Sequence, residues 1–196
     1  PRSGYPSGAL PDAAAHRPTS LYGSCKSLCE NLARRAYERD KVDVIGLRLS
    51  VVYGAGRIRG YMSYPSHMMR AAAETGAIHV AYGTQRLHWQ HVEEVAAMVG
   101  RALVSDRSGG GLTYNAPGDS RTWSEAAAAL RLARPELRVT IGSEIDPALS
   151  DVVEDYDASA FSEYYDYEMA WPLERGVKTT LDTYDAMLGT KSGVVR

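Results

Sequence analysis

Two side chains in the stretch SLYGSCKSLCE, Tyr22 and Lys26, have the types and the spacing needed for proton transfer. The stretch reads as a helix, and side chains four residues apart on a helix share one face, with Cβ atoms about 6 Å apart. A free tyrosine titrates near pH ~10, and an ammonium group beside a phenol favours the phenolate and lowers its pKa. Such a pair can act as acid and base at neutral pH, but the same spacing also occurs on solvated helices that do no chemistry.

A second candidate for chemistry is the glycine-rich stretch VVYGAGRIRG, in which Gly54, Gly56 and Gly60 follow an apolar segment. A dinucleotide-binding loop needs a helix that starts at once after its glycines, so that the helix N-terminus meets the pyrophosphate. Here other residues intervene before Pro65, which suits the first turn of the next helix. No acidic residue ends a second strand about twenty positions further on, as ribose binding requires. We therefore predict that the glycine stretch does not bind a dinucleotide.

The charge and cysteine content exclude several classes of protein. The chain has 196 residues, with 22 basic and 24 acidic residues and a net charge of -2, which argues against a nucleic-acid-binding protein. No apolar run is long enough to cross a membrane and no signal pattern opens the sequence, so we expect a cytoplasmic protein without a membrane partner. Cys25 and Cys29 share a helix face without further metal ligands. We predict no metal site and assign both thiols to packing in the reduced state.

Strand and helix patterns alternate along the chain, which predicts an α/β fold with a largely parallel sheet. The stretch VDVIGLRLSVVY, residues 42–53, is apolar enough for a strand in a sheet that is covered on both faces. The region 151–168 carries seven carboxylates interleaved with tyrosines, and we interpret it as a solvated acidic face with inward-packed aromatics. The other predicted strands are 78–81, 112–115 and 138–141, and the predicted helices are 19–40, 65–75, 92–104, 122–134 and 173–188.

Several segments match a known family in its own order along the chain. They are PTSLYGSCK, the strand LRLSVVYGAG, GTQRLHWQHVEEVA, GGLTYNAPG and AWPLERG. This series resembles the extended short-chain dehydrogenase/reductases, the NAD-dependent epimerase/dehydratase family, from about residue 17 to the end. The resemblance implies the second half of a Rossmann-like, mostly parallel sheet, followed by a small C-terminal α/β substrate-binding region.

The resemblance also implies roles for individual residues. Tyr22 is implied as the catalytic acid and base, with Lys26 as its charge partner and as a ligand of the ribose of NAD or NADP. Leu49, Ser50 and Val51 are implied to lie near the nicotinamide. The residues implied at the substrate cleft are Arg57, Arg86, His88 and Trp89.

The histidines and Trp89 leave alternatives open. His88 and Trp89 either offer a hydrogen bond and a stacking face to a sugar-like ring, or are a surface histidine and a packed tryptophan. His91 is predicted to fix its loop through a backbone hydrogen bond. The remaining histidines are isolated in the sequence and receive no role: His16, His67 and His79.

The chain departs from the family in three ways. The nucleotide-binding half is missing from these residues, and the catalytic Ser or Thr is not identified, because Ser3 and Ser7 follow no strand. Val51 stands where nucleotide-sugar epimerases have an Asn that holds the diphosphate. Leu87 and His88 replace an Arg-Asp pair. A diphosphate would lose charge-assisted hydrogen bonds, so we favour a smaller polyol, sugar acid or lactone-like substrate.

We therefore predict an NAD(P)-dependent oxidoreductase, epimerase or dehydratase that acts on a hydroxyl or carbonyl of a sugar-like molecule. The alternative is a redox-silent dinucleotide-sensing or interaction protein on the same scaffold. Residues 1–60 are expected to be the remaining Rossmann-type part, and 61–196 mainly the substrate-binding region, with 86–104 returning to the Rossmann core. The wide apolar arc of the Tyr–Lys helix predicts a homodimer through this helix, with Ala33 and Tyr37 near the axis.

Overall fold

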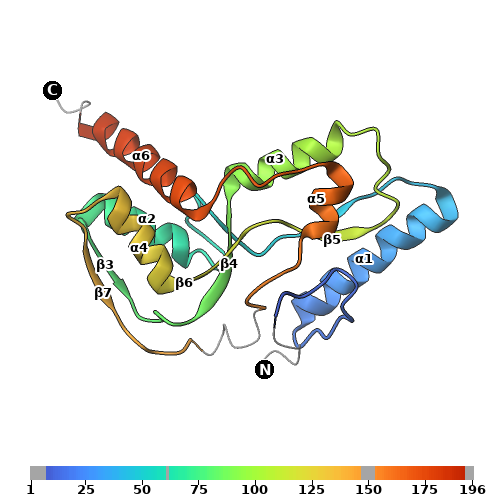
Figure 1. The fold of residues 1–196 in the computed structure, drawn as a ribbon, viewed down its shortest axis with the longest axis horizontal. Coiled ribbons are helices and arrows are strands. Elements are labelled where there is room, and N and C mark those ends of the chain that lie inside the picture. Colours follow the sequence, from blue (N-terminus) through green and yellow to red (C-terminus); the bar gives the residue numbers. More distant parts are fainter. Residues whose placement is uncertain (1–7, 61, 147–152, 193–196) are drawn as a thin grey trace.

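The computed structural model describes residues 8–60, 62–146 and 153–192. Within these ranges the chain alternates between short strands and helices, as the sequence patterns predict (Figure 1). The helices are α1 (Leu21–Asp40), α2 (Tyr64–Thr75), α3 (Val92–Leu103), α4 (Trp123–Ala133), α5 (Ser159–Tyr165) and α6 (Leu173–Ser192). The strands are β1 (Gly46–Arg48), β2 (Val51–Tyr53), β3 (Ala77–Val80), β4 (Arg86–His91), β5 (Thr113–Asn115), β6 (Asp119–Thr122) and β7 (Arg138–Ile141).

The described strands form three small sheets that are mostly parallel. β1 pairs with β5 and β3 with β7, both in parallel. The third sheet has the order β2-β4-β6, in which β2 and β4 are parallel and β4 and β6 antiparallel. The predicted α/β class is therefore confirmed.

The long apolar stretch 42–53 is two strands and not the single strand that its pattern predicts. β1 pairs with β5, whereas β2 pairs with β4, so the chain crosses from one sheet to another at Leu49 and Ser50. Neither face of β1 is fully covered in this structure, since its residues are only half-buried. Apolar composition alone does not reveal such a crossing, because both halves bury the same kind of side chain.

The core consists of two clusters of buried side chains, one in each lobe of Figure 1. The larger cluster lies among β2, β3, β4, α2, α4 and α6 and contains Trp89 and Trp123, whose ring centroids are 4.9 Å apart. The smaller cluster joins α3 and β5 to α5, where Phe161 and Tyr165 are buried. The predicted inward packing of aromatics in the acidic region is thus confirmed for these residues, and positions 151 and 152 lie outside the described residues.

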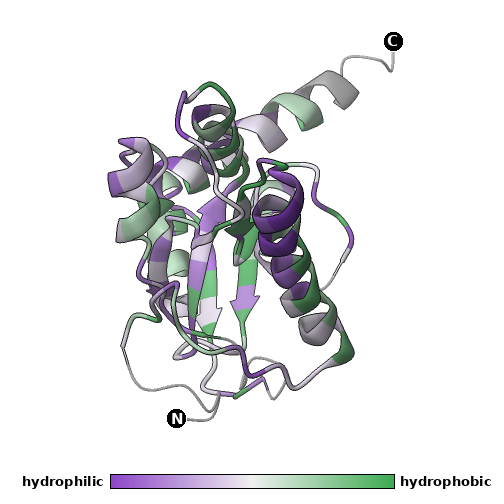
Figure 2. Cartoon of the chain, turned by 90° about the vertical axis from the view of Figure 1, so that its right-hand side faces the viewer, coloured by the Kyte–Doolittle hydropathy of each residue, from purple (hydrophilic) through white to green (hydrophobic). Residues whose placement is uncertain are grey.

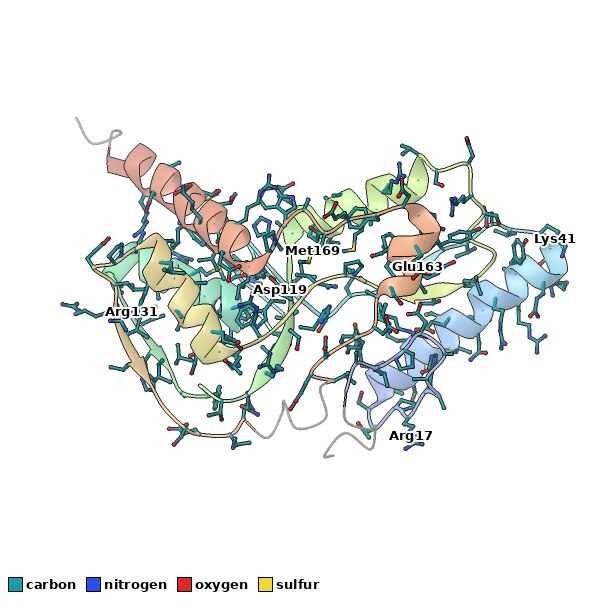
Figure 3. The ribbon with its side chains drawn as sticks, viewed as in Figure 1. Arg17, Lys41, Asp119, Arg131, Glu163 and Met169 are labelled. Atoms are coloured by element: carbon teal, nitrogen blue, oxygen red, sulfur yellow. The ribbon has the colours of Figure 1, made fainter. Side chains whose placement is uncertain are left out.

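Three elements were not predicted: β4, β6 and α5. β4 has the polar sequence RLHWQH, yet five of its six residues are buried. β6, with the sequence DSRT, positions Asp119, whose carboxylate accepts a hydrogen bond from the Leu173 N–H at 2.6 Å at the start of α6 (Asp119 is labelled in Figure 3). Polar strands of this kind lack the apolar alternation from which strands are read.

A methyl group at Gly176 of α6 would have no room, because a Cβ there would lie 2.1 Å from the Tyr53 hydroxyl oxygen. We expect Gly176→Ala to lower the free energy of unfolding by about 1–3 kcal/mol, the usual cost of overpacking a core. Gly100 of α3 is the matched control, because nothing lies within 4 Å of a Cβ placed there. Gly100→Ala should raise the free energy of unfolding by about 0.5–1 kcal/mol through helix propensity. Urea unfolding measures the free energy of unfolding of both variants. A Gly176→Ala protein as stable as wild type would contradict the packing argument.

Candidate active site

Helix α1 places Tyr22 beyond the carboxyl end of β1. Glu30 of α1 contacts Arg48 at the end of β1, while the C-terminal part of α1 packs on Gly111, just before β5. α1 therefore runs antiparallel to β1, and in Figure 3 the labelled Lys41 follows its C-terminal end, while Arg17 lies in the segment before its first turn. Tyr22 stands two helical turns before Glu30, about 12 Å further along the axis. Open α/β sheets bind ligands beyond the carboxyl ends of their strands.

The first turns of α1 hold Tyr22 and Lys26 together. Ser20 caps the helix, its Oγ accepting a hydrogen bond from the Gly23 N–H at 3.1 Å. The Lys26 Nζ lies 5.4 Å from the centroid of the Tyr22 ring. Both side chains are on the surface of the described chain, and Tyr22 is 73% exposed. The geometry that the four-residue spacing predicts is therefore present.

A stripe of leucines on α1 faces solvent. Leu21, Leu28 and Leu32 are all more than half exposed. Figure 2, which faces the end of the molecule that carries α1, shows hydrophobic and hydrophilic residues alternating along the helices and strands. The half-buried side of α1 is instead made of small and polar residues together with one aromatic: Gly23, Ser27, Glu30, Ala33 and Tyr37.

One prediction about α1 is wrong for this structure. Cys25 and Cys29 are exposed free thiols and do not pack in the core, because they lie near the outward stripe. Ala33 and Tyr37 are half-buried, and a Cβ at Gly111 would lie 3.1 Å from the Ala33 carbonyl oxygen and 2.8 Å from the Tyr37 Cβ, whereas their place near a dimer axis stays a prediction. Both residues pack against the body of the chain.

An ionic cluster around Arg48 fastens α1 to β1 and to the segment before α1. The guanidinium donates to both Glu30 carboxylate oxygens, at 2.7 and 2.9 Å, and to the Asp12 carbonyl oxygen at 2.9 Å. Burial opposes ionisation of Glu30, but the hydrogen bond and charge of Arg48 outweigh it and lower the pKa of this carboxyl. His16, which the sequence left isolated, lies 3.1 Å from Glu30 and belongs to the same cluster.

Asn115 at the end of β5 completes this cluster. It is fully buried, and its amide Nδ2 donates to the Leu10 and Asp157 carbonyl oxygens at 2.7 and 3.1 Å. Its Oδ1 accepts from Arg48 at 3.3 Å. Sequence reasoning missed Arg48 and Asn115, although both lie in the LRLSVVYG and YN segments that carry the resemblance. The structural role of Arg48 and Asn115 depends on partners from distant segments, and a local sequence pattern does not show these partners.

The residues implied to lie near the nicotinamide form the crossing between β1 and β2. Leu49 is 46% exposed and Val51 is buried. The Ser50 N–H donates to the side chain of Gln90, a residue of β4 that received no role in the sequence, at 2.8 Å. The crossing is therefore held by β4 from within the core.

The glycine stretch after β2 has a packing role in this structure. Gly54 has φ +155°, and a Cβ there would lie 2.7 Å from Val92 Cγ1, so glycine lets β2 pass the start of α3. The chain continues as a loop until α2 begins at Tyr64. No helix N-terminus follows the glycines directly, so the arrangement that binds a pyrophosphate is not formed here.

The structure does not bring the four candidate substrate residues together. Trp89 is 2% exposed, stacks edge-on with Tyr53 and donates its indole N–H to the Arg121 carbonyl oxygen at 2.9 Å, so the packing alternative describes it. Arg57 follows β2 and donates to the Val52 carbonyl oxygen. Arg86 opens β4 and lies 3.4 Å from the Glu125 carboxylate. Because β2 and β4 run parallel, the two arginines stand at opposite ends of their sheet.

His88 and His91 are buried in β4. The His88 Nε2 lies 3.2 Å from the Ala116 carbonyl oxygen, so Nε2 carries a proton, whereas the buried Nδ1 has no hydrogen-bond partner and lies 3.5 Å from the Asp155 carboxylate. The alternative of a surface histidine is wrong for His88. His91 Nδ1 accepts a hydrogen bond from the Glu93 N–H at 3.3 Å and caps α3, which confirms its predicted role.

The family model for the NAD dependent epimerase/dehydratase family matches residues 4–116, more than half of the chain. The chain belongs to this family. No curated protein sequence matches it. The NAD dependent epimerase/dehydratase assignment agrees with the Tyr–Lys helix and the strands described above, and the description of the family names NAD as the cofactor.

Solved structures of the same fold include L-threonine dehydrogenase from Phytophthora infestans, with a TM-score of 0.79 and 17% identity over 95% of this chain and 62% of that one. The dTDP-glucose 4,6-dehydratase from Bacillus anthracis, in complex with NAD, has a TM-score of 0.69 and 20% identity over 92% of this chain and 57% of that one. RMD from Pseudomonas aeruginosa, complexed with NADPH, has a TM-score of 0.74 and 13% identity over 91% of this chain and 60% of that one. The chain thus spans about three fifths of their length and shares the Rossmann-like fold.

The described residues fit one end of the dinucleotide. Tyr22 and Lys26 stand exposed beyond the end of β1, where a nicotinamide and its ribose can approach them. The described chain holds no glycine loop that leads directly into a helix, so it lacks a cradle for the pyrophosphate. No described group of acidic, histidine or cysteine side chains could hold a metal ion, and no described helix is long and apolar enough to span a membrane.

Acidification should destabilise this family member through its buried histidines. Burial lowers the pKa of His88 and of His91 below the ordinary value of 6.5, so the unfolded chain binds more protons than the folded one. The contribution of the two neutral histidines to the free energy of unfolding is therefore complete above about pH 6.5, and it is lost progressively as the pH falls below that value. We expect His88→Gln to weaken this pH dependence in urea unfolding, because Gln does not titrate. His79→Gln on β3 is the exposed control, and identical pH slopes in His88→Gln and wild type would contradict the assignment.

Proposed function

We propose that this chain supplies the catalytic pair and the substrate-binding region of an NAD(P)-dependent oxidoreductase, epimerase or dehydratase. The observation that carries the proposal is the Tyr22–Lys26 pair, exposed at the start of α1 beyond the carboxyl end of β1. Residues outside the described chain supply the pyrophosphate cradle.

In this proposal the bound NAD(P) supplies the hydride acceptor or donor. Tyr22 moves the proton of the substrate hydroxyl, as acid or as base according to the direction of the reaction. The Lys26 ammonium, on the same face of α1, favours the phenolate form of Tyr22 and binds a ribose hydroxyl. The backbone of Leu49, Ser50 and Val51 would border the nicotinamide, and the partly exposed Leu49 side chain would limit the access of water to it, while the Val51 side chain is buried.

We propose a small hydroxyl-bearing substrate, such as a polyol, sugar acid or lactone-like molecule, in preference to a nucleotide-diphosphate sugar. Three positions at which nucleotide-sugar enzymes of the family hold the diphosphate are buried here and offer no exposed polar group: Val51, Leu87 and His88. The similarity to an L-threonine dehydrogenase, which is named for a small hydroxy acid, supports the same size class. Arg57 and Arg86 are the candidates for binding an acidic group.

The catalytic pair is tested in a protein that joins this chain to its dinucleotide-binding half. Tyr22→Phe should reduce turnover of NAD(P) with small hydroxy substrates by about 10²–10⁴, the usual contribution of a positioned acid and base. Lys26→Met should weaken cofactor binding and shift the pH optimum upward, because the phenolate loses its charge partner.

Helix α1 provides a matched control for this test. Tyr37 and Lys41 have the same four-residue spacing, with the Lys41 Nζ 5.3 Å from the Tyr37 ring centroid, but Tyr37 packs against the body of the chain. Tyr37→Phe should leave turnover and the pH profile unchanged. Equal losses in Tyr22→Phe and Tyr37→Phe, or an unchanged pH profile in Lys26→Met, would argue against the proposed roles.

We further propose that α1 forms the interface of a homodimer. Its outward stripe of Leu21, Leu28 and Leu32 is apolar and has no cover among the described residues. This face differs from the Ala33 and Tyr37 face that the sequence suggested, because those residues are already in contact with the body of the chain.

The dimer is tested by sedimentation equilibrium at micromolar concentration on the protein with its dinucleotide-binding half. Leu28→Glu should produce monomers, because a charge in an apolar interface costs several kcal/mol. Leu132→Glu on α4, where Leu132 is 77% exposed on the other lobe, is the control and should remain dimeric. A monomeric wild type would rule out the interface.

A further inference from the structure

The side chain of Gln90 occupies the point at which two sheets separate. Before Leu49 the chain pairs with β5, and after Ser50 it pairs with β4. The Ser50 N–H lies in between and donates to Gln90 Oε1 at 2.8 Å. The chain that leaves β5 turns past the same side chain, and Gln90 Nε2 donates to the Ala116 and Pro117 carbonyl oxygens at 2.9 and 3.0 Å. One amide thus joins β4, the crossing and the end of β5.

The chemistry of these contacts requires an amide in one orientation. The Ser50 N–H can only donate, so it needs an acceptor, and the two carbonyl oxygens can only accept, so they need a donor. A carboxylate of the same length offers acceptors alone and would face both carbonyl oxygens with negative charge. An apolar side chain would leave the half-buried Ser50 N–H and the buried Pro117 carbonyl without this partner, at a cost in stability for each group.

The surroundings allow Gln90 little freedom to move. It is 1% exposed. A Cβ at Gly118 would lie 2.7 Å from Gln90 Cγ and 2.7 Å from the Trp89 carbonyl oxygen, so the chain after β5 presses directly on β4. Close packing on this side fixes the amide, and the amide in turn fixes the backbone of Ser50.

We infer that Gln90 is a positioning residue for the reaction: it sets how far the backbone of Leu49, Ser50 and Val51 stands from the nicotinamide. This inference rests on the proposed function, in which these residues pack beside that ring. Gln90 is buried and does not touch the substrate, so it acts through Ser50. Its loss should change the geometry of hydride transfer more than the binding of the dinucleotide, which is held mainly through its pyrophosphate.

The test uses the protein that joins this chain to its dinucleotide-binding half. Gln90→Met should speed hydrogen–deuterium exchange at the Ser50 amide and reduce kcat by about 10- to 100-fold, the effect expected of a misplacement near 1 Å. KM for NAD(P) should change much less than kcat. In Gln90→Glu, the ratio of kcat to that of wild type should rise as the pH falls, because a neutral carboxyl can both accept from Ser50 and donate to a carbonyl oxygen.

Gln85 gives a matched control. Its amide also binds backbone groups in both directions, accepting from the Asp146 N–H at 2.8 Å and donating to the Asp146 carbonyl oxygen at 3.0 Å, far along the chain from the crossing. Gln85→Met removes the same kind of contacts and should leave Ser50 exchange and kcat close to wild type. If wild type is active and Gln90→Met has the same kcat as Gln85→Met, the positioning role is overturned and the proposed function stands. If wild type shows no NAD(P)-dependent turnover, the proposed function fails, and the positioning role with it.

Discussion

The separation of two sheets at Leu49 and Ser50 is the constraint on which the rest of the structure depends. Where strands part, backbone groups lose their ladder partners, and buried groups without partners are costly. The side chain of Gln90 meets this cost at the crossing, and the side chain of Arg48 fastens the neighbouring segments beside it. Arg48 binds α1 and the segment before it, and Gln90 binds the crossing and the chain after β5. Core packing and the position of the candidate active site are thus set by the same few contacts.

Helix α1 shows how this constraint reaches the surface. Its inward side is small or polar and is joined to the sheet by the Glu30–Arg48 ion pair, so few apolar side chains are needed there. Its leucines point outward, where they lie free for another apolar surface. Tyr22 and Lys26 stand between these two sides. A helix fastened by hydrogen bonds and charge has a defined rotation about its axis, which is what a proton-transferring pair at its start requires.

Much of the fold could be predicted from local patterns. The bounds of α1, α2 and α3 lie within two residues of those predicted, and the Thr122–Glu125 capping box opens α4 as its spacing predicts. The start of α6 is also predicted, but the helix continues to Ser192 and not to residue 188. β4 could not be predicted, because its buried residues are polar. His88, Gln90 and His91 are stable there only through partners at Ala116, Pro117 and Glu93. The family resemblance located the Tyr–Lys pair, whereas the residues that hold it in place depend on contacts between segments 18 to 67 positions apart in the sequence.

By itself the sequence determined the α/β class, the family and the helical spacing of Tyr22 and Lys26, because each depends on residues close together in the chain. Only the tertiary structure decided that the stretch 42–53 crosses between sheets and that α1 turns its leucines outward. It also decided that Trp89 is core and not a substrate face. The physical reason is the same in each case. The direction in which a side chain points depends on the distant segments that pair with the polar and charged groups around it. The sequence of one strand or helix does not contain that information.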